Sequence, residues 1–240
     1  MIKFFRKIRQ RLLIENKVSK YLLYAIGEIV LIVIGILIAL KINNWNEYQK
    51  AIKSENEYLT SLQNEISANI ERLKLVNANN NIWTSDGSDI VQKLKIGIDT
   101  LSDSEVTRAF NFYESLIKSP VLDIIVSSNS NVLVKKKGLI TDFRNLNDAY
   151  NGVLLQESYM TEFWNTKVVD FFISCGIPYQ GYLENETTIS MKEIEIGGYS
   201  EKQFIALLKI KSVLQDYWEV ERDSALERSK EILNLLKNAN

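Results

Sequence analysis

The hydrophobic positions of the chain follow different patterns on the two sides of residue 43. From residue 21 to 42 almost every position is apolar, and the run AIGEIVLIVIGILIAL at residues 25–40 contains Glu28 as its only charge. A helix rises about 1.5 Å per residue, so about twenty such residues cover the roughly 30 Å hydrocarbon core of a membrane. Residues 21–42 are therefore predicted to form a transmembrane helix.

Beyond residue 43 the apolar positions recur every three or four residues, as on one face of an amphipathic helix. A first helix is marked by Tyr58, Leu62, Ile66, Ile70 and Leu73. The Asn-rich run at residues 77–81 is expected to end it. Ser102 and Glu105 have the spacing of a capping box and predict a shorter helix that stops before Pro120.

Two further helices are predicted, over residues 138–172 and 201–236. The apolar positions of the first are Ile140, Phe143, Leu146, Tyr150, Val153 and Leu154, and those of the second are Phe204, Leu207, Leu208, Leu214, Tyr217, Trp218 and Leu226. Between them, alternation in TTISMKEIEI at residues 187–196 permits a small strand. We expect a mainly α fold, in which the transmembrane helix continues into an antiparallel bundle of about four to six helices at residues 43–240.

Charge orients the predicted span. Residues 1–20 hold seven basic residues against Glu15, a net charge of +6, whereas residues 43–240 carry −7 of a chain total of −1. The positive-inside rule then places the N-terminus in the cytoplasm and residues 43–240 in the periplasm. A cleaved signal peptide is the competing interpretation, but the apolar run leads into LKINNWNE and not into a small-residue cleavage site.

The first twenty residues are predicted to form a basic amphipathic segment on the cytoplasmic side. Its lipid-facing basic residues are Lys3, Arg6, Lys7, Arg9 and Arg11. A basic segment so close to a span is best explained by contact with anionic lipids, so membrane lipids are expected partners and nucleic acid is not.

The N-terminal residues also carry a resemblance. MIKFFRKIRQRLL, ENKVSKYLLYAIGEIVLIVIGILIAL and KINNWNE resemble the N-terminal signature of a large bacterial family of single-pass membrane proteins of unknown function, and SENEYLTSLQNEISANIERL resembles that family's next helix. The resemblance implies the same topology at the bacterial inner membrane. It implies no activity, substrate or catalytic residue.

Composition argues against the common enzyme classes. The chain has no histidine, one cysteine and two prolines, and no Gly-rich phosphate-binding pattern. The usual general base, nucleophile pairs and zinc ligands are therefore missing, and we expect no enzyme activity, cofactor or metal. Four clustered acidic residues lack the spacing of a calcium loop and predict a solvated acidic loop: Glu184, Glu186, Glu193 and Glu195. FWNTKVVDFF, with Phe163, Trp164, Phe171 and Phe172, is interpreted as bundle core.

The predicted span contains the candidate functional residues. Glu28 lies about 10 Å into the membrane, with Tyr24 four residues earlier as a hydrogen-bond donor. Glu28 is interpreted as setting helix depth or oligomer register; an ion-coupled role and contact with a membrane partner stay open. Gly27, Gly35 and Ala39 share one ridge, and small residues let two helices approach closely.

Three functional hypotheses follow. The first is a non-enzymatic interaction or scaffold module that associates with itself or with another membrane or periplasmic protein. The second is an accessory subunit of an ion-driven or transport complex that uses Glu28. A hydrolase with paired carboxylates in the outer domain is a distant third.

Overall fold

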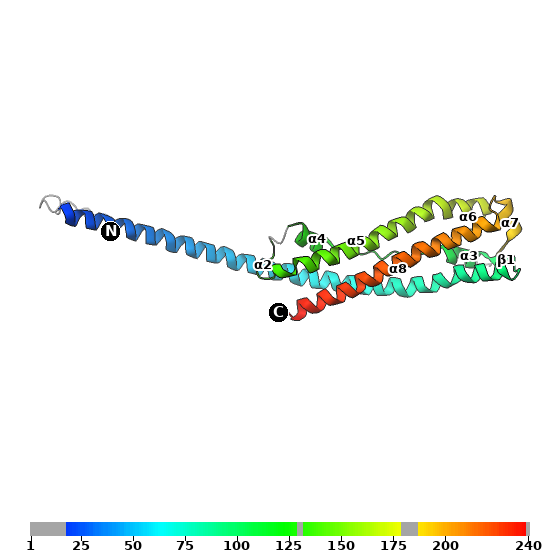
Figure 1. The fold of residues 1–240 in the computed structure, drawn as a ribbon, viewed down its shortest axis with the longest axis horizontal. Coiled ribbons are helices and arrows are strands. Elements are labelled where there is room, and N and C mark those ends of the chain that lie inside the picture. The colour runs from blue at the N-terminus through cyan, green and yellow to red at the C-terminus, as the bar shows by residue number, and fades with distance from the viewer. Residues whose placement is uncertain (1–17, 129–131, 179–186, 239–240) are drawn as a thin grey trace. The chain divides into compact units, whose positions relative to one another are not determined.

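The structure is a computed structural model that describes residues 18–128, 132–178 and 187–238. Its elements in chain order are α2 (Val18–Lys95), β1 (Thr100–Ser102), α3 (Asp103–Phe110), α4 (Pro120–Ser127), η1 (Lys137–Leu139), α5 (Ile140–Phe163), the π-helical turn η2 (Trp164–Val168), α6 (Val169–Cys175), β2 (Thr188–Ser190), α7 (Met191–Ile196) and α8 (Glu201–Asn238). The mainly α prediction is confirmed (Figure 1). The chain forms two compact units, Met1–Ser54 and Glu55–Asn240, which we call unit 1 and unit 2.

Helix α2 is longer than the sequence predicted. The expected end at residues 77–81 is wrong, because the helix continues to Lys95. The Asn77 side chain donates to Asp223 Oδ1 at 2.8 Å, and the Asn80 side chain binds the backbone of Tyr113. Asn77 Nδ2 and the Asn80 amide thus bind distant partners, which reduces their competition for the local backbone hydrogen bonds that hold the helix.

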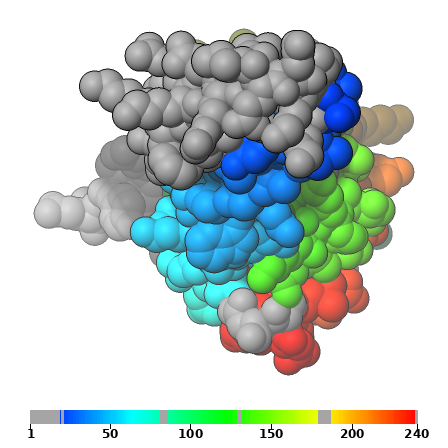
Figure 2. Space-filling model, turned by 90° about the vertical axis from the view of Figure 1, so that its left-hand side faces the viewer, coloured from blue at the N-terminus to red at the C-terminus, as the bar shows by residue number. Residues whose placement is uncertain are grey.

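Three long helices surround the larger core of unit 2. The residues of α2 after Glu55 pack with α5 and α8, and these segments lie against one another in Figure 1 and in the turned view of Figure 2. Large buried side chains of this core include Leu62, Ile66 and Leu73 from α2, Phe143 and Tyr150 from α5, and Trp218 from α8. The first helix predicted from periodicity therefore buries the expected face.

Contacts between distant residues show in which directions the long helices of unit 2 run. Asn77 contacts Asp223 while Asn80 accepts from Gln215 Nε2 at 3.1 Å, so α8 runs antiparallel to α2. Tyr150 of α5 is hydrogen bonded to Ser229 of α8 at 2.8 Å. Helices α2 and α5 run in the same direction (Figure 1). An intervening segment must therefore carry the chain back along α2.

This return segment consists of the non-helical residues 111–119, helix α4 and the residues that lead into η1. Along it, Tyr113, Lys118, Val121 and Lys135 bind the side chains of Asn80, Asn69, Glu65 and Glu55, in that order. The residue numbers of these partners on α2 fall from 80 to 55 as the return segment advances, so the segment runs antiparallel to α2. Polar side chains of α2 thus bind backbone groups of the return segment that no sheet or helix satisfies, those of the non-helical residues 111–119 and of the first turn of α4 among them.

The predicted helix that stops before Pro120 is corrected by the structure. Helix α3 ends earlier, at Phe110, and Pro120 begins α4. Proline suits the first turn of a helix because its missing N–H has no partner there. The Glu65 carboxylate accepts from the next two N–H groups, those of Val121 and Leu122, at 2.8 and 3.1 Å. Ser102 does cap α3, and its hydroxyl accepts from Glu105 N at 3.2 Å.

A second core lies between the last turns of α2 and the elements α3, α6, α7 and α8. It is rich in phenylalanine: Phe110, Phe163, Phe171, Phe172 and Phe204. Strands β1 and β2 form a two-stranded antiparallel sheet beside it, with Leu101 opposite Ile189. The small strand permitted by residues 187–196 is confirmed over Thr188–Ser190, whereas the residues after it form α7.

Candidate functional site

Four of the predicted residues of the span, Tyr24, Gly27, Gly35 and Ala39, are exposed on α2, whereas Glu28 is half-buried. Tyr24 is 49% exposed, and Glu28 follows it by one turn. A β-carbon built at Gly27 or Gly35 meets no atom within 4 Å, so the small-residue ridge is open in the single chain. The basic residues Lys3, Arg6, Lys7, Arg9 and Arg11 lie outside the described residues.

One helix among the described residues is long and apolar enough to cross a membrane, judged by length and composition. It covers Leu22–Asn80, and its most apolar window has a mean hydropathy of 2.7 with no buried residue. Such an N-terminal helix fits a membrane span or a signal sequence.

The acidic residues of the predicted loop fall into two groups. Glu184 and Glu186 lie outside the described residues, whereas Glu193 and Glu195 belong to helix α7, so the loop prediction is wrong for these two; Glu193 also caps this helix. The Glu193 carboxylate accepts from Ser190 N at 2.7 Å, and the Ser190 hydroxyl accepts from Glu193 N at 3.3 Å. The backbone N–H and the hydroxyl of Ser190 both donate to the Glu193 carboxylate and lower its pKa. Within the described ranges, no group of three or more Cys, Asp or Glu side chains is placed to hold a metal ion.

The aromatic run FWNTKVVDFF packs in the core, as interpreted from the sequence. Phe171 stacks on Phe204 with ring centroids 5.3 Å apart, and Phe110 contacts Phe171 and Phe172 at 5.7 and 5.9 Å. Burial raises the pKa of the nearby Cys175 thiol to about 11. A thiol with such a pKa carries little of the reactive thiolate at neutral pH, so Cys175 is a weak candidate nucleophile.

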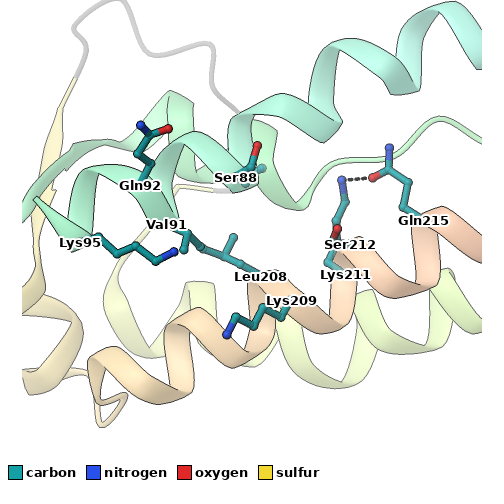
Figure 3. Close-up of a pocket in the computed structure, with 11 residues that line it drawn as sticks. Ser88, Val91, Gln92, Lys95, Leu208, Lys209, Lys211, Ser212 and Gln215 are labelled. Carbon is teal, nitrogen blue, oxygen red and sulfur yellow. Dashed lines mark hydrogen bonds between the residues drawn. The ribbon is translucent and has the colours of Figure 1, made fainter.

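A pocket in unit 2 gathers basic and polar side chains that the sequence did not single out. Its cavity has a volume of about 540 Å³ and lies between the end of α2, Ala109 of α3 and the first half of α8. Ser88, Val91, Gln92 and Lys95 of α2 line it together with Leu208, Lys209, Lys211, Ser212 and Gln215 of α8, and all nine are labelled in Figure 3. Three lysines thus border one cavity, and the residues that line it include no carboxylate.

Lys211 is the unusual member of this pocket. Its residue is only 3% exposed, and its ammonium donates to Gln215 Oε1, whose own amide donates to Asn80 O. Burial lowers the pKa of Lys211 to about 8, and the charge of Asp86 acts in the opposite direction. Lysine is rarely buried without a paired charge, because transfer of an ammonium out of water is costly.

Glu157 and Arg222 form a second buried polar cluster. Glu157 Oε2 accepts from the Ser115 hydroxyl at 3.0 Å, and Glu157 Oε1 accepts from Ser115 N. Arg222 is fully buried, and its guanidinium carbon lies 4.5 Å from the Trp218 ring centroid. Burial raises the pKa of Glu157 and lowers that of Arg222. This cluster lies in the core between helices, and we assign it a structural role.

Sequence periodicity missed these polar positions for a definable reason. The buried face of α8 continues through Phe204, Leu208, Lys211, Gln215 and Trp218, so polar residues occupy positions where the helical period expects apolar ones. Tyr217 was predicted to belong to this face, but it is 63% exposed. A search for charged residues at helical spacing from apolar ones would have found Lys211.

Comparison with known proteins gives a family match for part of the chain. Residues 28–105 match the DUF6090 family of unknown function. The DUF6090 match confirms the resemblance seen in the sequence, within the range that it covers. It includes Glu28, Gly35 and the α2 side of the pocket, and it ends in α3 before the residues that α8 supplies. No curated protein and no solved structure gave a significant match to the chain.

Proposed function

We propose that the protein is a single-pass membrane-anchored module of the bacterial inner membrane that is not an enzyme and acts by binding other proteins, foremost a second copy of itself. Residues 21–42 span the membrane, the N-terminus is cytoplasmic, and residues 43–240 form a periplasmic helical domain. The observation that carries the proposal is the apolar window of α2, which is as apolar as a span and has no residue buried in the chain.

The exposed surface of α8 supports a role in protein interaction. Ile210, Val213, Tyr217 and Val220 are between 48% and 67% exposed, and their spacing of three, four and three residues forms a stripe opposite the buried face of the helix. Such spacing is that of a helix seam in a coiled coil. Two copies present the same stripe, so a symmetric pair is self-complementary.

Anchoring favours this self-association. Two copies anchored in one membrane meet at a raised effective concentration. A second contact elsewhere in the same chain would therefore strengthen dimers that the α8 stripe alone holds weakly. The open ridge of Gly27, Gly35 and Ala39 offers that second contact through close packing of two spans.

The topology is tested by fusing reporters after residue 240. A reporter that is active only outside the cytoplasm should be active, and one that is active only inside should not. Replacement of Lys3, Arg6, Lys7, Arg9 and Arg11 by Gln should reduce this preference, because the charge bias orients the span. Replacement of Lys135, Lys136 and Lys137 is the matched control and should leave it unchanged. Activity of the cytoplasmic reporter alone in the unaltered chain would contradict the proposal.

An ion-coupled accessory subunit is the second candidate, and the position of Glu28 within the apolar window favours it. Glu28→Gln preserves size and hydrogen bonding but removes titration. If the protein is an interaction module, cross-linking in cells should recover the same partners with this variant as with the unaltered chain. An ion-coupled subunit should keep its partners and lose the ion flux that the complex supports.

A further inference from the structure

The pocket between α2 and α8 contains a positive charge that the described chain does not neutralise directly. The ammonium of Lys211 donates to the neutral side chain of Gln215. Asp86, the carboxylate whose charge acts on Lys211, binds Arg108 Nε at 3.1 Å. A buried ammonium that faces only a neutral acceptor loses solvation without gaining an ion pair, so an anion in the pocket would stabilise it.

The walls of the pocket combine positive charge with apolar surface. Lys95 extends from α2 toward Val91 and Leu208, and Lys211 and Gln215 lie farther along α8 (Figure 3). Val91, Ala109 and Leu208 supply the apolar part of the wall. A volume of about 540 Å³ lies within the roughly 300 to 1,000 Å³ of pockets that bind small molecules.

We propose that this pocket binds a small organic anion, a carboxylate on an apolar body, with the carboxylate at Lys211 and Gln215 and the apolar body against Leu208 and Val91. Lysine binds anions as a point charge through its three donors, and Gln215 Oε1 takes one of the donors of Lys211. Inorganic phosphate would satisfy the charge but would leave the apolar wall uncovered.

Two properties of the site favour this ligand class. The pKa of Lys211 is lowered to about 8, so its side chain is still mainly protonated at neutral pH. Lys95 and Lys209 add positive charge at the border of the cavity and would attract an anion from solution.

The test uses the full chain in lipid nanodiscs, with empty nanodiscs as the blank, and measures binding calorimetrically. The probes are hexanoate, its uncharged counterpart hexanol, and inorganic phosphate. Hexanoate should bind at least about tenfold more tightly than either of the others, because only hexanoate meets both the charge and the apolar wall. Equal binding of hexanoate and hexanol, or no binding of hexanoate, would overturn the proposal.

Variants locate the site. Lys211→Met retains the apolar stem and should weaken hexanoate binding to the level of hexanol. Lys202→Met removes an exposed lysine from the first turn of α8 and should leave the affinity unchanged. If Lys211→Met binds hexanoate as tightly as the unaltered chain, the assignment of the carboxylate to Lys211 is wrong.

A third variant keeps the test decisive if Lys211→Met unfolds. A β-carbon at Gly87 would lie 3.9 Å from Leu208 Cδ2, which is an ordinary contact, so a larger side chain there extends into the cavity. Gly87→Leu should abolish binding of hexanoate and hexanol together, whereas Gly87→Ala should retain most of it. Unchanged hexanoate binding by a folded Gly87→Leu variant would place the ligand elsewhere.

Discussion

At the scale of residues, buried amides and carboxylates take the place of regular secondary structure. Asn80 Oδ1 accepts from Tyr113 N at 2.9 Å, and its Nδ2 donates to Tyr113 O at 3.2 Å. Asn69 repeats this pairing with Lys118 at 3.3 and 2.9 Å. A side-chain amide has the same donor and acceptor as a peptide group, so each asparagine pairs with the return segment as a neighbouring strand would.

The Asn80 pairing predicts a large loss of stability in Asn80→Leu. Leucine has a similar size but leaves the N–H and C=O of Tyr113 without their partner at a fully buried position. We expect a loss of about 2 to 4 kcal/mol in the free energy of unfolding, measured with urea. Asn234→Leu, at an exposed position of α8, is the matched control and should change it little. A loss no larger than that of the control would mean that Asn80 does not hold the return segment.

Among the helices, α2 differs most along its length in how far its apolar side chains are buried. In unit 2, α2 buries Leu59, Leu62, Ile66, Ile70 and Leu73 against α5 and α8. In unit 1 its apolar side chains are exposed; Leu31, for example, is 70% exposed. Exposed apolar surface on this scale requires lipid or another helix.

Self-association of the span is predicted to depend on Gly35 and Glu28. In an in-membrane assay on residues 1–50, Gly35→Leu should separate the two backbones and weaken association. Glu28→Leu should weaken it by about 1 to 2 kcal/mol if the carboxylate lies at the contact. Val33→Leu, which faces away from the ridge, should associate like the unaltered segment. If Gly35→Leu and Glu28→Leu also associate normally, the spans do not pair through this ridge.

In the molecule as a whole, unit 2 is held together by contacts among its own residues, from its first residue onward. Glu55, its first residue, is 1% exposed and accepts hydrogen bonds from the N–H groups of Lys135 and Lys136 at 2.8 to 3.0 Å. The return segment is therefore bound to α2 at the start of the unit as well as near Asn80. Both core clusters of unit 2 consist of residues from Leu59 onward, so the unit contains its own core.

A fragment of residues 46–240 is accordingly expected to fold without a membrane. Its far-UV spectrum should be mainly helical, and it should unfold cooperatively because its apolar faces are buried within the unit. A fragment that starts at residue 60 lacks Glu55 and Leu59 and should be less stable by at least about 2 kcal/mol. A spectrum dominated by strand or coil for residues 46–240 would contradict this prediction.

Local periodicity in the sequence is enough to predict the long helices and most of their buried faces. The apolar window of α2, the helices α5 and α8 and most of the buried faces of α2 and α5 follow from repeats of three or four residues, because neighbouring turns of one helix share a face. The prediction is wrong for Leu154 of α5, which is 40% exposed. The sequence also shows, without reference to the fold, that the chain has no histidine to serve as a general base or a zinc ligand.

Only the tertiary structure decided which polar residues lie inside. The local sequence around Asn80 predicts the end of a helix, yet Asn80 lies inside α2 and binds Tyr113 of the return segment. Pro120 was likewise expected to stop a helix, but it begins α4. Lys211 acquires its environment from Gly87, Ser88 and Val91, more than a hundred positions earlier in the chain. Periodicity reports only which turns of one helix are neighbours, whereas the partner that makes burial of a polar group tolerable comes from a distant segment that folding brings close.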